Sequence, residues 1–314
     1  MNFDEIIGHY KIKDQIVKSI KLKDFSHAHI IVGEDGIGKS IIARETAALI
    51  LGKSSDTQCV DIVECRINGN KKSIGIDEIK GIIEEVNKKP YEGDKKVIII
   101  YNADKITEVA QNALLKTIEE PPNGIYLILL CEKLDSILDT IQSRCETYKL
   151  NRLKDEDIVI FLNRNFPNLP EEERKSVIAF SDGIPGRAER FVEDSSLHEI
   201  RDVTAQVLLE LQAEGIEFIS KYSLFLFKHK DEWQEILTCI LSYIRDALIY
   251  KETGNKNFLI NSDKFNDIKN MCEIFSFNKL NGIINIIKRT RMKLEDNVSP
   301  SLVFDSMLVN MQEV

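Results

Sequence analysis

The chain has 314 residues, of which 43% are hydrophobic and 30% charged, and its formal net charge is −9. This length predicts two or three domains rather than one core, and the negative charge argues against a DNA-binding surface spread over the whole molecule. The apolar runs are far too short for a membrane span, and the first residues lack the basic and apolar regions of a signal peptide, so we expect a cytoplasmic protein.

Hydrophobic periodicity divides the first half of the chain into alternating helices and strands. A helix is expected within residues 4–23, a β-branched strand at residues 29–32 and a second helix at residues 41–51. The later strands are expected at residues 60–67, 96–101, 125–131 and 146–150, and the helices between them at about 77–89, about 107–120 and 136–143. This alternation predicts an α/β domain over residues 1–152, in which helices flank a doubly wound parallel sheet.

The eight residues that directly follow the first predicted strand read G-E-D-G-I-G-K-S. They match the P-loop pattern G-x-x-x-x-G-K-[ST]. Gly33, Gly36 and Gly38 would let backbone N–H groups curl around phosphate oxygens. Lys39 would reach the β and γ phosphates, and Ser40 would offer its hydroxyl to Mg²⁺. Because the loop joins a strand to a helix, we expect a nucleotide site that takes ATP or ADP with Mg²⁺.

The site lacks the acid that P-loop ATPases use for hydrolysis. These enzymes hold Mg²⁺ with an acidic residue at the end of a second buried strand, and they position water with a neighbouring group. The strand at residues 96–101 instead runs into Tyr101 and Asn102. Asp104 follows three residues late, and we expect its carboxylate to point elsewhere. The sequence therefore predicts a nucleotide cradle without its hydrolytic partner.

The six cysteines form no C-x-x-C pair and mostly have apolar neighbours in the sequence. Cys59 and Cys65 have no histidine within the next hundred residues that could complete a four-ligand zinc site. We therefore expect buried free thiols and no zinc.

Strand signals fade in the second half of the chain, where helices are expected at residues 155–166, 171–180 and 187–192. We assign these to a small helical lid at residues 153–197. Further on, apolar residues recur at steps of three and four within residues 233–248 and 280–287. Residues 198–314 are therefore predicted to form an all-α domain.

Two motifs together identify a family resemblance. Residues 114–122 read L-L-K-T-I-E-E-P-P and residues 143–145 read S-R-C, a combination that closely resembles the clamp-loader AAA+ subunits. The resemblance is strong up to about residue 192 and weaker beyond. It implies a P-loop AAA+ domain, a lid and an all-α collar that holds subunits in a ring. The missing acid points to the family's largely non-hydrolysing member.

The resemblance also implies a function and partners. Such a subunit helps to load the sliding clamp onto primer-template DNA in replication, together with motor subunits (tau/gamma) and a delta subunit. Arg144 of S-R-C corresponds to an arginine finger that acts in trans on the ATP site of the neighbouring motor subunit. The chain by itself is then expected to be inactive as an ATPase. Glu132 and Gly186 stand where active relatives carry a polar sensor and a lid arginine.

Other functions stay open at this stage. The chain could be an active motor subunit of the same loader, or an autonomous P-loop NTPase or kinase. Either activity needs a metal-binding acid, for which Asp104 and Glu119 are the local candidates. Arg144 could equally form an ordinary salt bridge with one of the many acids.

Overall fold

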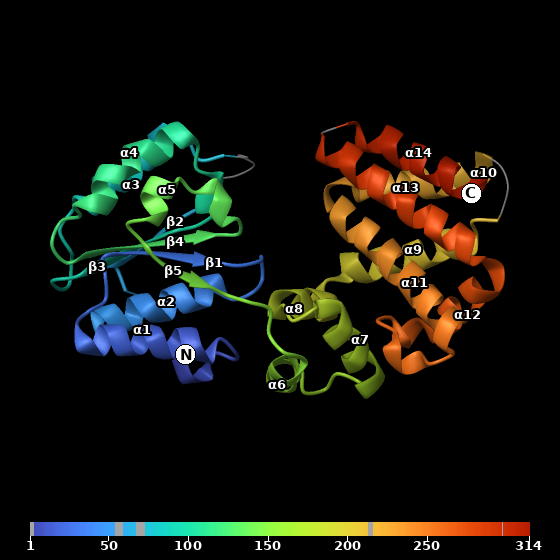
Figure 1. Ribbon diagram of the computed structural model, residues 1–314, viewed down its shortest axis with the longest axis horizontal. Helices are drawn as coiled ribbons and strands as arrows, with labels where there is room; N and C mark the ends of the chain where they lie inside the picture. Colours follow the sequence, from blue (N-terminus) through green and yellow to red (C-terminus); the bar gives the residue numbers. More distant parts are fainter. Residues whose placement is uncertain (1–2, 54–58, 67–72, 213–215, 297) are drawn as a thin grey trace. The chain divides into compact units, whose positions relative to one another are not determined.

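The fold comes from a computed structural model that describes residues 3–53, 59–66, 73–212, 216–296 and 298–314 (Figure 1). The chain divides into two units. The first contains Met1–Phe161 and Gly183–Gly186, and the second contains Leu162–Asp182 and Arg187–Val314. The expected division into three domains at residues 152 and 197 stays a prediction.

Five parallel strands form the sheet of the first unit: β1 (Ala28–Val32), β2 (Ile62–Cys65), β3 (Lys96–Ile100), β4 (Ile125–Cys131) and β5 (Glu146–Lys149). Their order is β2-β3-β4-β1-β5, so β1 lies inside the sheet between β4 and β5. Strands β1 and β3 are buried along their whole length, which explains why all but one residue of each is apolar. The expected parallel α/β sheet is confirmed.

Helices cover both faces of the sheet (Figure 1). The first face packs against α1 (Tyr10–Leu22) and α2 (Lys39–Leu51) through Val97 and Ile99 of β3, among others. The alternate residues of β3 face the opposite core, which contains α3 (Ile76–Val86), α4 (Glu108–Glu119) and α5 (Asp139–Gln142). This alternation follows from the two-residue period of a strand.

Several of the expected elements differ from the observed ones at their ends. The strand expected at residues 60–67 covers only Ile62–Cys65, because Asp61 accepts hydrogen bonds from the N–H groups of Tyr91 and Glu92 at 2.6 and 2.9 Å; residue 67 lies outside the described residues. The helix expected at 136–143 begins only at Asp139, since the backbone of the two residues before it is extended.

The segment after β5 contains α6 (Asp155–Asn165), α7 (Glu171–Ser181) and α8 (Pro185–Glu193). Helix α8 begins two residues before the expected position, because Pro185 is tolerated in the first turn of a helix, where its missing N–H costs no hydrogen bond.

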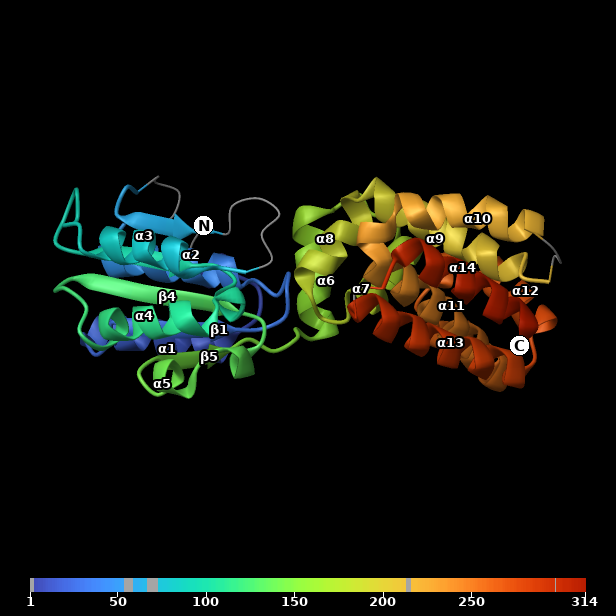
Figure 2. The ribbon, with the colours of Figure 1, turned by 90° about the horizontal axis from the view of Figure 1, so that it is seen from above.

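The rest of the second unit is helical, as expected. Its α-helices are α9 (Ser195–Leu209), α10 (Ile216–Lys228), α11 (Trp233–Thr253), α12 (Phe265–Ile274), α13 (Phe277–Glu295) and α14 (Pro300–Glu313). The last two run side by side (Figure 2). Short 3₁₀ helices occur at Phe3–Glu5, Ala103–Lys105, Leu134–Ser136, Lys230–Glu232, Lys256–Phe258 and Ser262–Lys264. Among the helices that the structure describes, none combines the length and hydrophobicity that a membrane crossing needs.

Candidate functional site

The P-loop leaves the buried strand β1 and enters α2 in a strongly turned conformation. The N–H of Gly33 donates to the carbonyl of Cys131 at the end of β4, at 3.1 Å. Gly36 and Gly38 have φ angles of +77° and +105°, which L side chains rarely adopt. No side chain caps the N-terminus of α2 at Gly38. The first N–H groups of this helix are therefore suited to an anion, so the loop fits a nucleotide phosphate.

Lys39 and Ser40 are the first two residues of α2. The ammonium of Lys39 donates to the carbonyl oxygens of Gly33 and Glu34 at 2.7 and 2.9 Å. These two bonds hold the lysine across the loop, and it must break them to reach a phosphate. Ser40 is half-buried at the start of the helix, the place from which a P-loop hydroxyl can meet a nucleotide-bound Mg²⁺. The predicted cradle residues thus lie in the loop and in the first turn of α2.

Two further groups contact this loop. His9 shares a hydrogen bond with the carbonyl of Ile37 at 3.2 Å, and burial lowers the pKa of the imidazole. The N–H of Gly186, at the start of α8, donates to the carbonyl of Gly36 at 3.0 Å. Our sequence reasoning did not include His9. It follows Gly8 directly and precedes α1, and both residues have positive φ, whereas the sequence placed His9 within the range of the first expected helix.

A cluster of side chains fills the position after β3. The hydroxyl of Tyr101 donates to a carboxylate oxygen of Glu64 at 3.1 Å, and the guanidinium of Arg66 lies 4.0 Å from the centre of the Tyr101 ring. Glu64 also binds Arg44 of α2 at 2.5 and 3.1 Å and Arg66 at 3.0 Å. We call Arg44, Glu64, Arg66 and Tyr101 the tyrosine cluster.

The contacts within the tyrosine cluster keep the carboxylate of Glu64 ionised. Hydrogen bonding to Arg44, aided by Arg66 and Tyr101, lowers the pKa of Glu64 to about 2, although partial burial opposes the shift. Glu64 therefore stays ionised and paired across the physiological range. The place of the usual metal-binding acid holds a phenol that bonds within the protein, followed by Asn102 in a left-handed conformation.

Asp104 lies in the 3₁₀ turn after β3. Its carboxylate accepts a hydrogen bond from the backbone N–H of Glu132, at 3.3 Å. Burial raises the pKa of the neighbouring Cys131 thiol to about 12; the charge of Asp104 adds to this shift and that of Lys39 opposes it. Asp104 is thus a partner of the loop after β4.

Arg144 lies in the turn between α5 and β5. Its Nε forms an ion pair with Glu119, the last residue of α4, at 2.6 Å. Its Nη1 donates to the carbonyl of Thr140 at 2.8 Å and contacts the hydroxyl of Ser143 at 3.3 Å. The side chain of Arg144 remains 40% exposed. The arginine therefore has the salt bridge that we considered as an alternative, and it is still accessible from outside.

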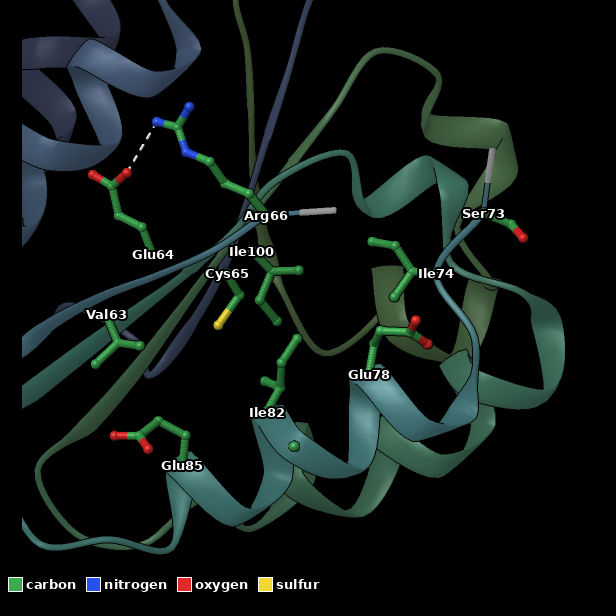
Figure 3. A pocket seen from close by; sticks show the side chains of 11 residues that line it. Val63, Glu64, Cys65, Arg66, Ser73, Ile74, Glu78, Ile82, Glu85 and Ile100 are labelled. Atoms are coloured by element: carbon green, nitrogen blue, oxygen red, sulfur yellow. Dashed lines mark hydrogen bonds and ion pairs between the residues drawn. The ribbon is translucent and has the colours of Figure 1, made fainter. Parts of the chain in front are cut away.

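A cavity of about 490 Å³ lies between the end of β2 and α3 (Figure 3). Ile74, Ile82 and Ile100 supply apolar lining. The charged residues around it already have protein partners: Glu64 and Arg66 bind each other, Glu85 binds Lys96, and Glu78 accepts from the N–H of Gly75. The cavity therefore presents no free charge to a ligand among the described residues.

In the part of the chain that the structure describes, no group of three or more His, Cys, Asp or Glu side chains could hold a metal ion. All six cysteines are free thiols, and Cys59 accepts a hydrogen bond from the ammonium of Lys53 at 3.3 Å. The expected absence of zinc stays a prediction.

Comparison with known proteins identifies the family. Residues 8–154 match the family model described as DNA polymerase III, delta subunit, and residues 199–313 match a second model, which describes the C-terminal part of DNA polymerase III delta. DNA polymerase III subunit delta' of Bacillus subtilis is 26% identical over 96% of each chain. Subunit gamma of Buchnera aphidicola from Schizaphis graminum is 27% identical over 93% of this chain and 90% of that protein.

Two further matches agree with this family assignment. The replication factor C small subunit of Methanococcus vannielii is 31% identical over 56% of this chain and 53% of its own length. The solved structure of a DNA polymerase III gamma subunit-related protein of Thermotoga maritima shares the fold, with a TM-score of 0.55 over 96% of this chain and 99% of that one, at 16% identity. The chain belongs to the clamp-loader AAA+ family, among the delta-prime subunits of DNA polymerase III.

Proposed function

We propose that the chain is a clamp-loader subunit that does not hydrolyse ATP itself and donates Arg144 in trans to the ATP site of a neighbouring motor subunit. The observation that carries this proposal is the tyrosine cluster. The phenol of Tyr101 occupies the usual position of the metal-binding acid and bonds to Glu64. A site without that acid cannot hold Mg²⁺ for phosphoryl transfer in the usual way.

The P-loop supports a binding role in the same subunit. The backbone groups of the loop, Lys39 and the hydroxyl of Ser40 would hold ATP or ADP with Mg²⁺, which neutralises phosphate charge when it is bound. Nucleotide at this site would act as a static ligand.

The geometry around Arg144 suits a group offered to another subunit. Its neighbour Cys145 packs against the core beneath α4, and burial raises the pKa of that thiol to about 12. The turn therefore has a rigid base, while the guanidinium stays accessible. Arginine fingers stabilise negative charge on the transferred phosphoryl group and are worth about 10³ to 10⁵ in rate.

The family supplies the rest of the proposal. The partners would be tau/gamma motor subunits and a delta subunit, with the sliding clamp and primer-template DNA contacted through the complex in the cytoplasm. Residues 1–152, 153–197 and 198–314 would serve as the AAA+ domain, the lid and the collar.

The test is steady-state ATP hydrolysis by the chain alone, and by the loader reconstituted with motor subunits, delta, clamp and primed DNA. We expect no turnover by the chain alone. In the reconstituted loader, Arg144→Ala should remove the fraction of DNA-stimulated hydrolysis that comes from the one ATP site completed by Arg144. Unchanged hydrolysis would remove the finger assignment.

A matched control comes from the second unit. Arg190 is 50% exposed and forms an ion pair with Glu235 at 2.9 Å, so it resembles Arg144 in exposure and pairing. Arg190→Ala should leave DNA-stimulated hydrolysis unchanged. Equal losses in both variants would indicate damaged assembly rather than a missing finger.

One observation favours a second function, that of an active ATPase. Asp104 and Lys39 both lie near Cys131, since the charge of each affects the pKa of that thiol. Mg²⁺-dependent turnover by the isolated chain, abolished by Asp104→Ala, would establish that function.

A further inference from the structure

The guanidinium of Arg144 is held by three groups of its own subunit. Its Nε pairs with the carboxylate of Glu119 at 2.6 Å. Its Nη1 donates to the carbonyl of Thr140 and contacts the hydroxyl of Ser143. The side chain of Arg144 is 40% exposed, so its own subunit holds part of the guanidinium and the rest is open to solvent.

Folding gives little reason for this ion pair. The side chains of Arg144 and Glu119 are 40% and 43% exposed, and exposed ion pairs contribute little to stability. Glu119 is also the last residue of α4, where the helix dipole disfavours a negative charge. The carboxylate thus stands in an unfavourable position, which its pairing with Arg144 offsets.

The helix that carries Glu119 is firmly connected to the segment that carries Arg144. Gln111 of α4 donates to the carbonyl of Ser136 at 2.8 Å and accepts from the N–H of Leu138 at 2.8 Å. The ion pair is a second connection, near the opposite end of α4. The two together fix the turn of Arg144 relative to this helix.

We propose that Glu119 is a positioning residue, which holds the guanidinium of Arg144 in the orientation from which its exposed part reaches the phosphate of the neighbouring site. This inference rests on the finger role proposed above. A free arginine side chain has many rotamers, and ordering it during the reaction reduces the rate. With Glu119 in place, that ordering is complete before the neighbouring subunit binds.

Three substitutions of Glu119 separate positioning from charge. Glu119→Gln keeps an oxygen that can accept from Nε, and should lose less than about half of the DNA-stimulated kcat that Arg144→Ala loses in the reconstituted loader. Glu119→Ala removes the acceptor and Glu119→Asp withdraws it by one methylene. Both should lose most of the kcat that Arg144→Ala loses and leave the KM for ATP within about twofold.

A double-mutant cycle decides whether Glu119 acts through Arg144. In a chain that already carries Arg144→Ala, Glu119→Ala should cause no further loss of turnover. Glu235→Ala breaks the comparable ion pair with Arg190 and serves as the control for loss of a surface charge. It should leave kcat unchanged.

Each other outcome overturns the inference. An additional loss in the Arg144→Ala background would assign Glu119 to assembly, and a rise in turnover with Glu119→Ala would show that the pair restrains the finger instead. If Arg144→Ala lowers hydrolysis but Glu119→Ala does not, only the positioning role fails. If Arg144→Ala has no effect, the finger role fails and positioning fails with it.

Discussion

The loops after β1 and β3 leave the same edge of the sheet but are held by different kinds of contact. The loop after β1 is held by backbone hydrogen bonds and by Lys39, and its helix N-terminus has no capping side chain. The position after β3 is held by side chains, through the bonds between Tyr101, Glu64 and the two arginines. The first loop keeps groups that can bind an anion, whereas the side chains at the second position bind one another.

The largest expected effect tests the binding loop. Lys39→Ala should weaken Mg-ATP binding to the isolated chain by about 100-fold, or about 2.7 kcal/mol, because it removes the cation that meets the β and γ phosphates. Titration of a fluorescent ATP analogue measures this change. Equal affinity of the variant and the wild type would mean that the loop does not bind nucleotide as proposed.

The next largest effect tests the tyrosine cluster. The depressed pKa of Glu64 means that its contribution to stability is present above its ordinary pKa of 4.5 and is lost as pH falls toward its folded value of about 2. Glu64→Gln should lower the free energy of unfolding at pH 7 by about 2 kcal/mol. The difference between variant and wild type should shrink below pH 4.5.

Chemical denaturation at a series of pH values measures this difference. Glu189 is an exposed glutamate on α8, and Glu189→Gln is the control. A constant difference between Glu64→Gln and wild type down to pH 2 would contradict the assigned role of the carboxylate.

A third change would make the two loops alike. Tyr101→Asp combined with Asn102→Glu restores acids at the end of β3, and should raise Mg²⁺-dependent nucleotide affinity about tenfold, or about 1.4 kcal/mol. The isolated chain should still not hydrolyse ATP, since no neighbour supplies an arginine. The neutral pair Tyr101→Asn and Asn102→Gln is the control, because it makes the same shape change without charge. An equal gain in the control would exclude metal binding as the cause.

The smallest effect concerns Asp104. Asp104→Ala loses one long hydrogen bond to the N–H of Glu132, so the free energy of unfolding should fall by less than about 1 kcal/mol. The Mg²⁺ dependence of nucleotide binding, followed by calorimetry, should not change. A loss of Mg²⁺ dependence would show that Asp104 replaces the missing acid, and the difference between the two loops would then be smaller than we infer.

Local patterns were enough to predict the sheet and the P-loop. The apolar runs of β3 and β4 and the spacing of Gly33, Gly36 and Gly38 each depend on neighbouring residues in the chain. The predicted ends of helices and strands were less accurate where a contact with a distant residue determines them. Asp61 shortens β2 because it binds the N–H groups of Tyr91 and Glu92, thirty residues further on.

The contacts that define the candidate site are non-local as well. Glu119 and Arg144 are far apart in the sequence, and so are Glu64 and Tyr101 and the two glycines Gly36 and Gly186. No periodicity or motif indicates which acidic residue will form an ion pair with a given arginine, and the sequence contains 51 acidic residues. The sequence could therefore predict that Arg144 is important but not how it is held.

The contact between Gly36 and Gly186 leaves no room for a side chain at position 186. A Cβ at position 186 would lie 2.7 Å from the Cα of Gly36, so even alanine collides with the loop. An arginine at this position therefore needs α8 to move away from the P-loop. Together with the tyrosine cluster, this contact means that several simultaneous substitutions would be needed to give this chain both a metal-binding acid after β3 and a lid arginine.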